Sequence, residues 1–163
     1  MSPITHFLVG WTLANGDKGN RRDRLAITLA GVAPDIDGLG VVPEILTRNT
    51  DNPMLWFSEY HHLLHNLSFA VAVTIAAWFF AARRWKTAVL VFVSFHLHLL
   101  GDLIGARGPD GEQWPIPYLL PFSGSLQWAW EGQWYLNAWP NFAITLVLLM
   151  SAFYLAWRRG FSP

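Results

Sequence analysis

The sequence contains no cysteine, and charged residues make up only 13% of its 163 residues, about half of the roughly 25% found in ordinary soluble domains. Without cysteine there can be no disulfide and no thiolate metal site, so any bound metal must use histidine, aspartate or glutamate. The formal net charge is zero at pH 7 with neutral histidines, which provides no general attraction to nucleic acid. We therefore expect no nucleic-acid partner.

The first residues also lack the positively charged start and the small-residue cleavage site of a removable signal peptide. Apolar residues are abundant instead: they make up 53% of the chain, which includes ten tryptophans and eleven phenylalanines. We interpret residues 1–163 as a single domain, and a domain of that size cannot bury so many large apolar side chains. Part of this surface is therefore expected to face lipid.

Five helices are predicted from apolar runs that end at Gly, Pro, Asn or Arg. They cover approximately residues 4–14, 23–33, 59–82, 87–104 and 139–157. The last three contain apolar stretches of about 16 to 19 residues, close to the length that crosses a bilayer. The first two are too short to span alone, so they are expected to be re-entrant, interfacial or packed against the others.

The segments 34–59 and 105–137 are rich in glycine, proline and polar residues and are expected to be loops. The fold class predicted from this pattern is all-α: a membrane-associated bundle of about five helices, three of them long enough to span, with a polar metal-binding end. The alternative is a soluble bundle whose apolar helices are buried. The excess of tryptophan favours the membrane.

The basic residues indicate an orientation. If successive helices alternate in direction, nine of the eleven lysines and arginines lie on one side, in the turns at 15–24, 83–86 and 158–159. The positive-inside tendency makes this the cytoplasmic side of a multi-pass protein. The tryptophans of residues 114–139 fall at the opposite end, as in an interfacial aromatic belt.

Histidines and aspartates interrupt the apolar pattern at that same opposite end. His98 and Asp102 are four residues apart and share one face of a predicted helix. His61 and His65 have the same spacing, while His62 and His65 are three apart, so the sequence leaves open which pair converges. Polar groups in apolar surroundings must be paired, hydrogen-bonded or bound to metal.

Two further segments bring donors to the same end. Asp35 and Asp37 follow the predicted helix that Pro34 ends, and His6 opens the first helix. Each of these features alone is common in purely structural roles, such as helix caps and hydrogen-bonded pairs. Together they provide the nitrogen and oxygen ligands of a zinc or other divalent site. His96 lies about 200° around the helix from His98 and is expected to be structural.

The motifs THFLVGW, APDIDG, HHLLHNL and HLHLLGDL, followed by Gly108 and LLPFS, resemble the bacterial inner-membrane metal-dependent hydrolase family (YdjM-like). That family is remotely similar to zinc-dependent phospholipase C and single-strand-specific zinc nucleases. The resemblance covers residues 4 to 123, and the last predicted helix matches only in character. The ordered set of motifs is more specific than any one of them.

The resemblance implies one to three bound zinc ions or other divalent ions and a place in the bacterial inner membrane. The distribution of basic residues places the site toward the outer side. One position departs from the family pattern, because Tyr60 stands where the family has histidine, so His61 or His62 must substitute. The complete set of metal-ligand candidates is His6, Asp35, Asp37, His61, His62, His65, His98 and Asp102.

The function predicted on this basis is a membrane-bound, divalent-metal-dependent hydrolase of phosphoesters, with a membrane lipid as one possible substrate. Asp35 or Asp37 would serve as general base toward a metal-bound water. Arg107 would grip phosphate, unless it is an interfacial anchor. The alternative is a non-catalytic membrane protein in which the His/Asp cluster is a structural metal site or a hydrogen-bond network. A transporter is less favoured, because the donors gather at one end instead of lining a path.

Overall fold

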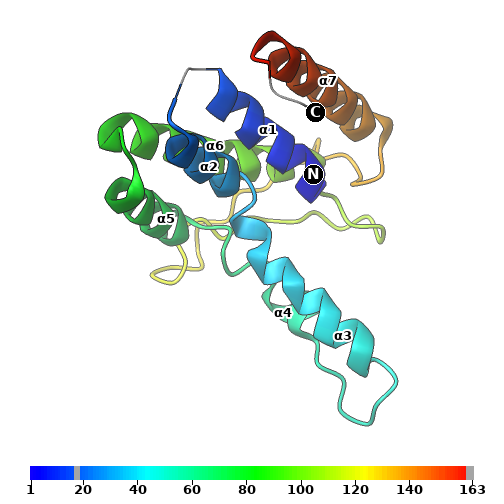
Figure 1. Ribbon diagram of the computed structural model, residues 1–163. Coiled ribbons are helices and arrows are strands. Elements are labelled where there is room, and N and C mark those ends of the chain that lie inside the picture. Colours follow the sequence, from blue (N-terminus) through cyan, green and yellow to red (C-terminus); the bar gives the residue numbers. More distant parts are fainter. Residues whose placement is uncertain (17–18, 161–163) are drawn as a thin grey trace.

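The computed structural model describes residues 1–16 and 19–160. Over these residues the chain is all-helical, with seven α-helices, one 3-10 helix and two isolated bridges in place of any strand (Figure 1). This confirms the predicted fold class. Four predicted helices are observed with small shifts in their ends, as α1 (Pro3–Asn15), α2 (Arg21–Ala30), α6 (Arg84–Gly105) and α7 (Trp139–Arg158).

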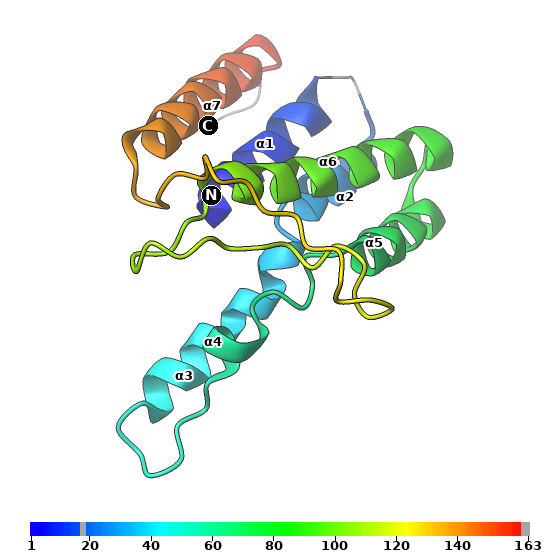
Figure 2. The same cartoon turned by 180° about the vertical axis from the view of Figure 1, so that it is seen from behind.

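The predicted loop over residues 34–59 is wrong. It contains the 3-10 helix η1 (Pro34–Gly40), α3 (Val41–Thr47) and α4 (Trp56–Tyr60), which together form an arm that projects from the bundle (Figures 1 and 2). Proline begins η1 because the first helical position needs no backbone donor. Helices this short show no apolar period, so the sequence pattern could not reveal them.

One side-chain contact ties the two helices of the arm together. The Glu44 carboxylate of α3 accepts hydrogen bonds from the Ser58 hydroxyl at 2.6 Å and from the Ser58 backbone N–H at 2.9 Å. These bonds join residues fourteen positions apart across the turn between α3 and α4. They hold the arm as a hairpin of helices.

The third predicted helix begins later than expected. Its observed counterpart, α5 (Leu67–Phe80), starts after Asn66, whose side chain accepts a hydrogen bond from the Phe69 N–H at 2.9 Å. This N-cap leaves the histidines of residues 61–65 in a turn. With 14 residues at 1.5 Å per residue, α5 is about 21 Å long and too short to span on its own.

Among the described residues, two helices are long and apolar enough to cross a membrane individually: α6 with 22 residues and α7 with 20. A third span is possible only if α2 and the η1–α3 segment are taken together, with a bend of 59° between them. Only 17% of the apolar window of α7 is buried within the protein. Its outer face is therefore available to lipid.

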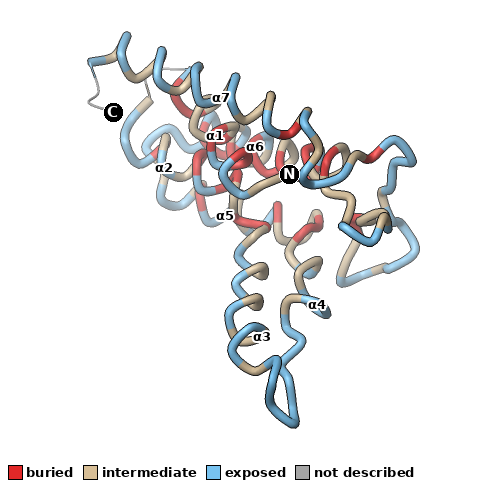
Figure 3. Tube along the Cα trace, turned by 90° about the vertical axis from the view of Figure 1, so that its right-hand side faces the viewer, coloured by how far each residue is buried: buried red, intermediate tan, exposed pale blue. Residues whose placement is uncertain are grey.

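The buried core lies where α1, α2 and α6 cross (Figure 3). Glycine allows this crossing to be close, because a Cβ atom on Gly31 would lie 2.8 Å from the His6 carbonyl oxygen and one on Gly10 would lie 2.8 Å from the Thr28 carbonyl oxygen. Phe95 and Leu99 of α6 are almost fully buried beside this crossing. The contact sets His6, Gly31 and α6 side by side.

The absence of cysteine allows a clean test of how α7 crosses the membrane. Ser125→Cys lies in the loop before α7 and Arg158→Cys replaces the last residue of α7, so the two single cysteines report on opposite ends of this helix, and both positions are exposed. In spheroplasts, a membrane-impermeant maleimide should label Ser125→Cys without permeabilisation and Arg158→Cys only after it, as the positive-inside tendency requires. Labelling of both positions from the same side would contradict the span.

Candidate metal centre

The centre of the polar cluster is a pair of residues on α6. His98 and Asp102 are one helical turn apart, and the His98 Nε2 atom lies 2.9 Å from the Asp102 Oδ2 atom. The His98 side chain is fully buried, while Asp102 remains 13% exposed. The shared face predicted from the i, i+4 spacing is therefore what the structure shows.

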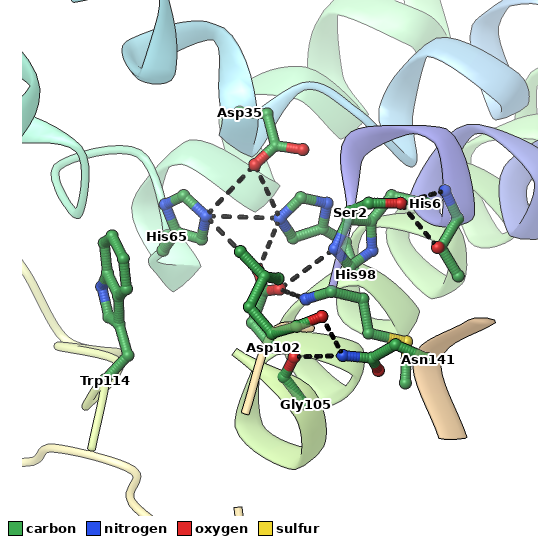
Figure 4. A network of polar contacts seen from close by, with 12 residues as sticks. Ser2, His6, Asp35, His65, His98, Asp102, Gly105, Trp114 and Asn141 are labelled. Carbon is green, nitrogen blue, oxygen red and sulfur yellow. Dashed lines mark hydrogen bonds and ion pairs between the residues drawn. The ribbon is translucent and has the colours of Figure 1, made fainter. Parts of the chain in front are cut away.

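Two other segments complete the group (Figure 4). His65, from the turn before α5, places its Nε2 atom 3.2 Å from the His98 Nε2 atom and 3.6 Å from the Asp102 Oδ2 atom. Asp35, from η1, places its Oδ1 atom 3.7 Å from the His98 Nε2 atom and 3.9 Å from the His65 Nε2 atom. One donor atom from each of these residues lies within 4.8 Å of all the others.

These separations match those of ligands around one cation. Four ligands at about 2.0 Å from a tetrahedral zinc ion are separated from one another by about 3.3 Å. Five of the six donor separations run from 2.9 to 3.9 Å around that value, and all six are within 4.8 Å. The group can therefore hold a divalent ion with little movement of its side chains, and its nitrogen and oxygen donors suit zinc as well as other divalent metals.

The His98 tautomer requires a proton or a metal ion beside Nε2. Its Nδ1 atom lies 2.8 Å from the Gly31 carbonyl oxygen, which can only accept, so Nδ1 carries the hydrogen. In the neutral ring, Nε2 then points a lone pair at the Asp102 carboxylate and at the His65 Nε2 atom. Either a proton or a metal ion must lie between these acceptors. A backbone carbonyl behind a ligand histidine is the usual support of a metal site.

Two further observations at the edge of the group also indicate a site for a positive charge. The Asp35 Oδ2 atom is buried without a hydrogen-bond partner. Burial lowers the pKa of His65, but the carboxylates of Asp102 and Asp37 outweigh it and raise this pKa to about 9. At neutral pH a proton therefore occupies the metal-free group, and an incoming metal ion would release it, because only the deprotonated imidazole is a ligand.

Asp37 lies behind the histidines, outside the group of four donors. Its Oδ1 atom accepts a hydrogen bond from His61 Nδ1 at 2.7 Å, and its Oδ2 atom accepts one from the Leu64 N–H at 3.0 Å. The same Oδ2 atom lies 3.7 Å from His65 Nδ1. His65 Nδ1 has no hydrogen-bond partner, so Asp37 acts on His65 as a neighbouring negative charge, while its hydrogen bonds go to His61 and to the Leu64 N–H.

His6 lies against the group on the other side of Asp102. Its ring stacks on His98 with centroids 3.7 Å apart, and its Nε2 atom lies 3.0 Å from the Asp102 Oδ1 atom. The backbone nitrogen of Met1 contacts the same oxygen. The carboxylate of Asp102 therefore faces His98 and His65 with one oxygen and His6 with the other.

The remaining predicted residues lie farther out. His61 contacts Asp37 and lines a cavity beside the group, whereas His62 lines only a second cavity of about 310 Å³. Arg107 donates from Nη2 to the Glu131 carbonyl at 2.7 Å and lies over the Tyr135 ring. This contact suits the anchor interpretation, and phosphate binding by Arg107 stays a prediction.

His96 faces away from the cluster, as the helical geometry predicted. Its Nδ1 atom donates to the Phe92 carbonyl at 2.8 Å, and its Nε2 atom accepts from the Tyr118 hydroxyl at 2.9 Å. Both ring nitrogens are thus hydrogen-bonded, one within α6 and the other to the loop that follows it. His96 provides a matched control for His98, two residues away on the same helix.

A cavity of about 440 Å³ opens onto the donor group. Asp35, His65 and Asp102 line it together with apolar side chains from the arm and from the loop that follows α6, which are Leu39, Phe57, Trp114 and Ile116. Sequence reasoning missed these walls, because they come from segments that showed no helical period. It also missed the Gly31 carbonyl, since backbone atoms leave no residue-type signal.

A small all-helical membrane protein with a buried His/Asp group that could hold a metal is the class that this fold and site define. The model of the YdjM inner membrane protein family matches residues 1–162. The chain belongs to this family. No curated protein and no solved structure matches the sequence.

The donor geometry predicts which side chains are needed for metal binding. His98→Ala and Asp102→Ala each remove a donor from the centre of the group and should reduce the bound metal to a small fraction of one equivalent in detergent-purified protein. His96→Ala should retain the metal of the unchanged protein. Elemental analysis measures all three, and equal loss in all three variants would contradict the assignment.

Proposed function

We propose that this protein is a membrane-bound, divalent-metal-dependent hydrolase that acts on phosphoesters. The observation that carries the proposal is the convergence of Asp35, His65, His98 and Asp102, whose donor atoms lie within 4.8 Å of one another beside an open cavity. Zinc is the proposed ion, since imidazole and carboxylate groups are among its usual ligands. The family's description as inner membrane proteins supports the proposed location.

A divalent ion in this group would lower the pKa of a bound water to about 7 and offset the charge on a phosphate. Asp35 is the better placed of the two proposed general bases, because it lines the cavity and its Oδ2 atom has no hydrogen-bond partner. In this role the Asp35 carboxylate would accept a proton from a water in the cavity, while His65, His98 and Asp102 held the ion and that water completed its coordination. Asp37 has both oxygens engaged, so its proposed role is to position His65 and His61.

The second candidate is a non-catalytic protein in which a metal ion joins η1, α6 and the turn before α5. Four protein donors can close a tetrahedral site, as in structural zinc sites. The cavity favours catalysis, because three of the four donor residues line it. A purely structural ion would be expected to be covered by protein on all sides.

Hydrolysis of bis(p-nitrophenyl) phosphate, a water-soluble phosphodiester, tests the proposal directly. Purified protein should release nitrophenolate, lose this activity on chelation and regain it when a divalent metal is added back. Asp35→Ala should reduce kcat by about 100-fold or more, the usual contribution of a general base. His96→Ala should be close to the unchanged protein. Protein with a full equivalent of metal and no hydrolysis would favour the structural alternative.

The positioning role of Asp37 predicts an intermediate effect. Asp37→Asn keeps the shape of the side chain but weakens its hold on the two histidines, so metal affinity should fall by about 10- to 100-fold without being abolished. Competition with a chromogenic chelator measures this change. A loss as complete as that of His98→Ala would make Asp37 a direct ligand.

A further inference from the structure

We propose that the cavity beside the donor group binds an acyl chain of a bilayer lipid, so that the phosphoester substrate is a membrane lipid. This inference rests on the proposed function and specifies its substrate class. Polar and apolar residues line different parts of the cavity. The polar atoms lie at one place, the donor group with His61, and the other walls are apolar.

Three separate segments supply the main apolar walls. Leu39 comes from η1 and Phe57 from α4, while Trp114 and Ile116 come from the loop after α6. The loop is held in place by backbone hydrogen bonds between Ile116 and Trp128 at 2.8 and 2.9 Å. A small, fully hydrated phosphoester would leave these walls in contact with water, whereas an acyl chain would remove their apolar surface from it.

The cavity also lies where a lipid can reach it. Ala106, which lines the cavity, directly follows the last residue of α6, and Leu136 lies three residues before α7 begins. These are the ends of the two helices that are able to cross a membrane individually. The cavity therefore opens at the level where the hydrocarbon core meets the headgroups, and an acyl chain can enter it from the bilayer.

The arm continues the apolar wall outward. Its exposed side chains include Leu39 at 66%, Leu46 at 76% and Trp56 at 52% exposure. Leu39 lines the cavity and is also one of the exposed residues, so the exposed apolar side chains of the arm begin at the cavity wall. An exposed apolar surface of this kind on a membrane protein is expected to contact lipid.

Photo-crosslinking tests the occupant. The complete protein is reconstituted in vesicles that contain phosphatidylethanolamine with a diazirine in one acyl chain, and the adducts are mapped by peptide mass spectrometry. Adducts are expected on Phe57, Trp114 or Ile116, in addition to those on the lipid-facing surface of α7. Adducts confined to α7 would overturn the proposal.

A pair of matched variants separates the cavity from the general lipid surface. Ala106→Trp places a large ring in the cavity, where it would occupy the space of the acyl chain, so cavity adducts should fall at least several-fold. Ala129→Trp places the same side chain at an exposed position outside the lining and should leave them unchanged. Leu136→Trp, at the cavity rim, replaces Ala106→Trp if that variant loses its metal. Cavity adducts that persist in the filled variant would overturn the proposal.

The two proposals fail in different ways. His98→Ala should lose metal and hydrolysis but keep the cavity adducts, because it changes only the donor group. Cavity adducts without any phosphodiester hydrolysis would remove the catalytic proposal and leave a lipid-binding protein. Hydrolysis without cavity adducts would overturn the lipid substrate and leave the enzyme.

Discussion

The hydrogen bond from His98 to the Gly31 carbonyl is the interaction on which the rest of the site depends. It places the hydrogen on Nδ1 at a distance of 2.8 Å and so directs the Nε2 lone pair at two carboxylates and a second imidazole. Acceptors this close repel one another unless a cation lies between them. The bond is possible only because α1, α2 and α6 cross with glycine at the contact. Packing of helix backbones thus determines the chemistry of a side chain.

The apolar surroundings of the protein account for the way in which its polar residues are clustered. An apolar chain with few charges can keep ionisable groups in its interior only if they are mutually satisfied. Here the groups come from η1, from the turn before α5 and from the C-terminal half of α6, beside a cavity lined by the arm and by the loop after α6. This placement gives the cavity a polar floor, formed by the donor group, and apolar walls.

Sequence reasoning succeeded where the signal was periodic. α6 and α7 were predicted within a few residues, and the i, i+4 spacing placed His98 and Asp102 on one face while turning His96 away. It failed for α3, α4 and η1, because helices of five to seven residues are too short to show a period. It also overextended the third helix, since the Asn66 cap could not be distinguished from a residue within a continuing helix.

The sequence by itself determined the class of protein and the donor types: an all-helical membrane protein whose metal ligands could only be histidine and carboxylate, at one end of the bundle. It proposed eight candidate ligands but could not rank them, because spacing relates residues on one helix and says nothing about distances between segments. Only the tertiary structure decided that Asp35, His65, His98 and Asp102 form the group while Asp37 and His61 stand behind it. Those distances are set by close backbone packing between helices, a property of the whole fold.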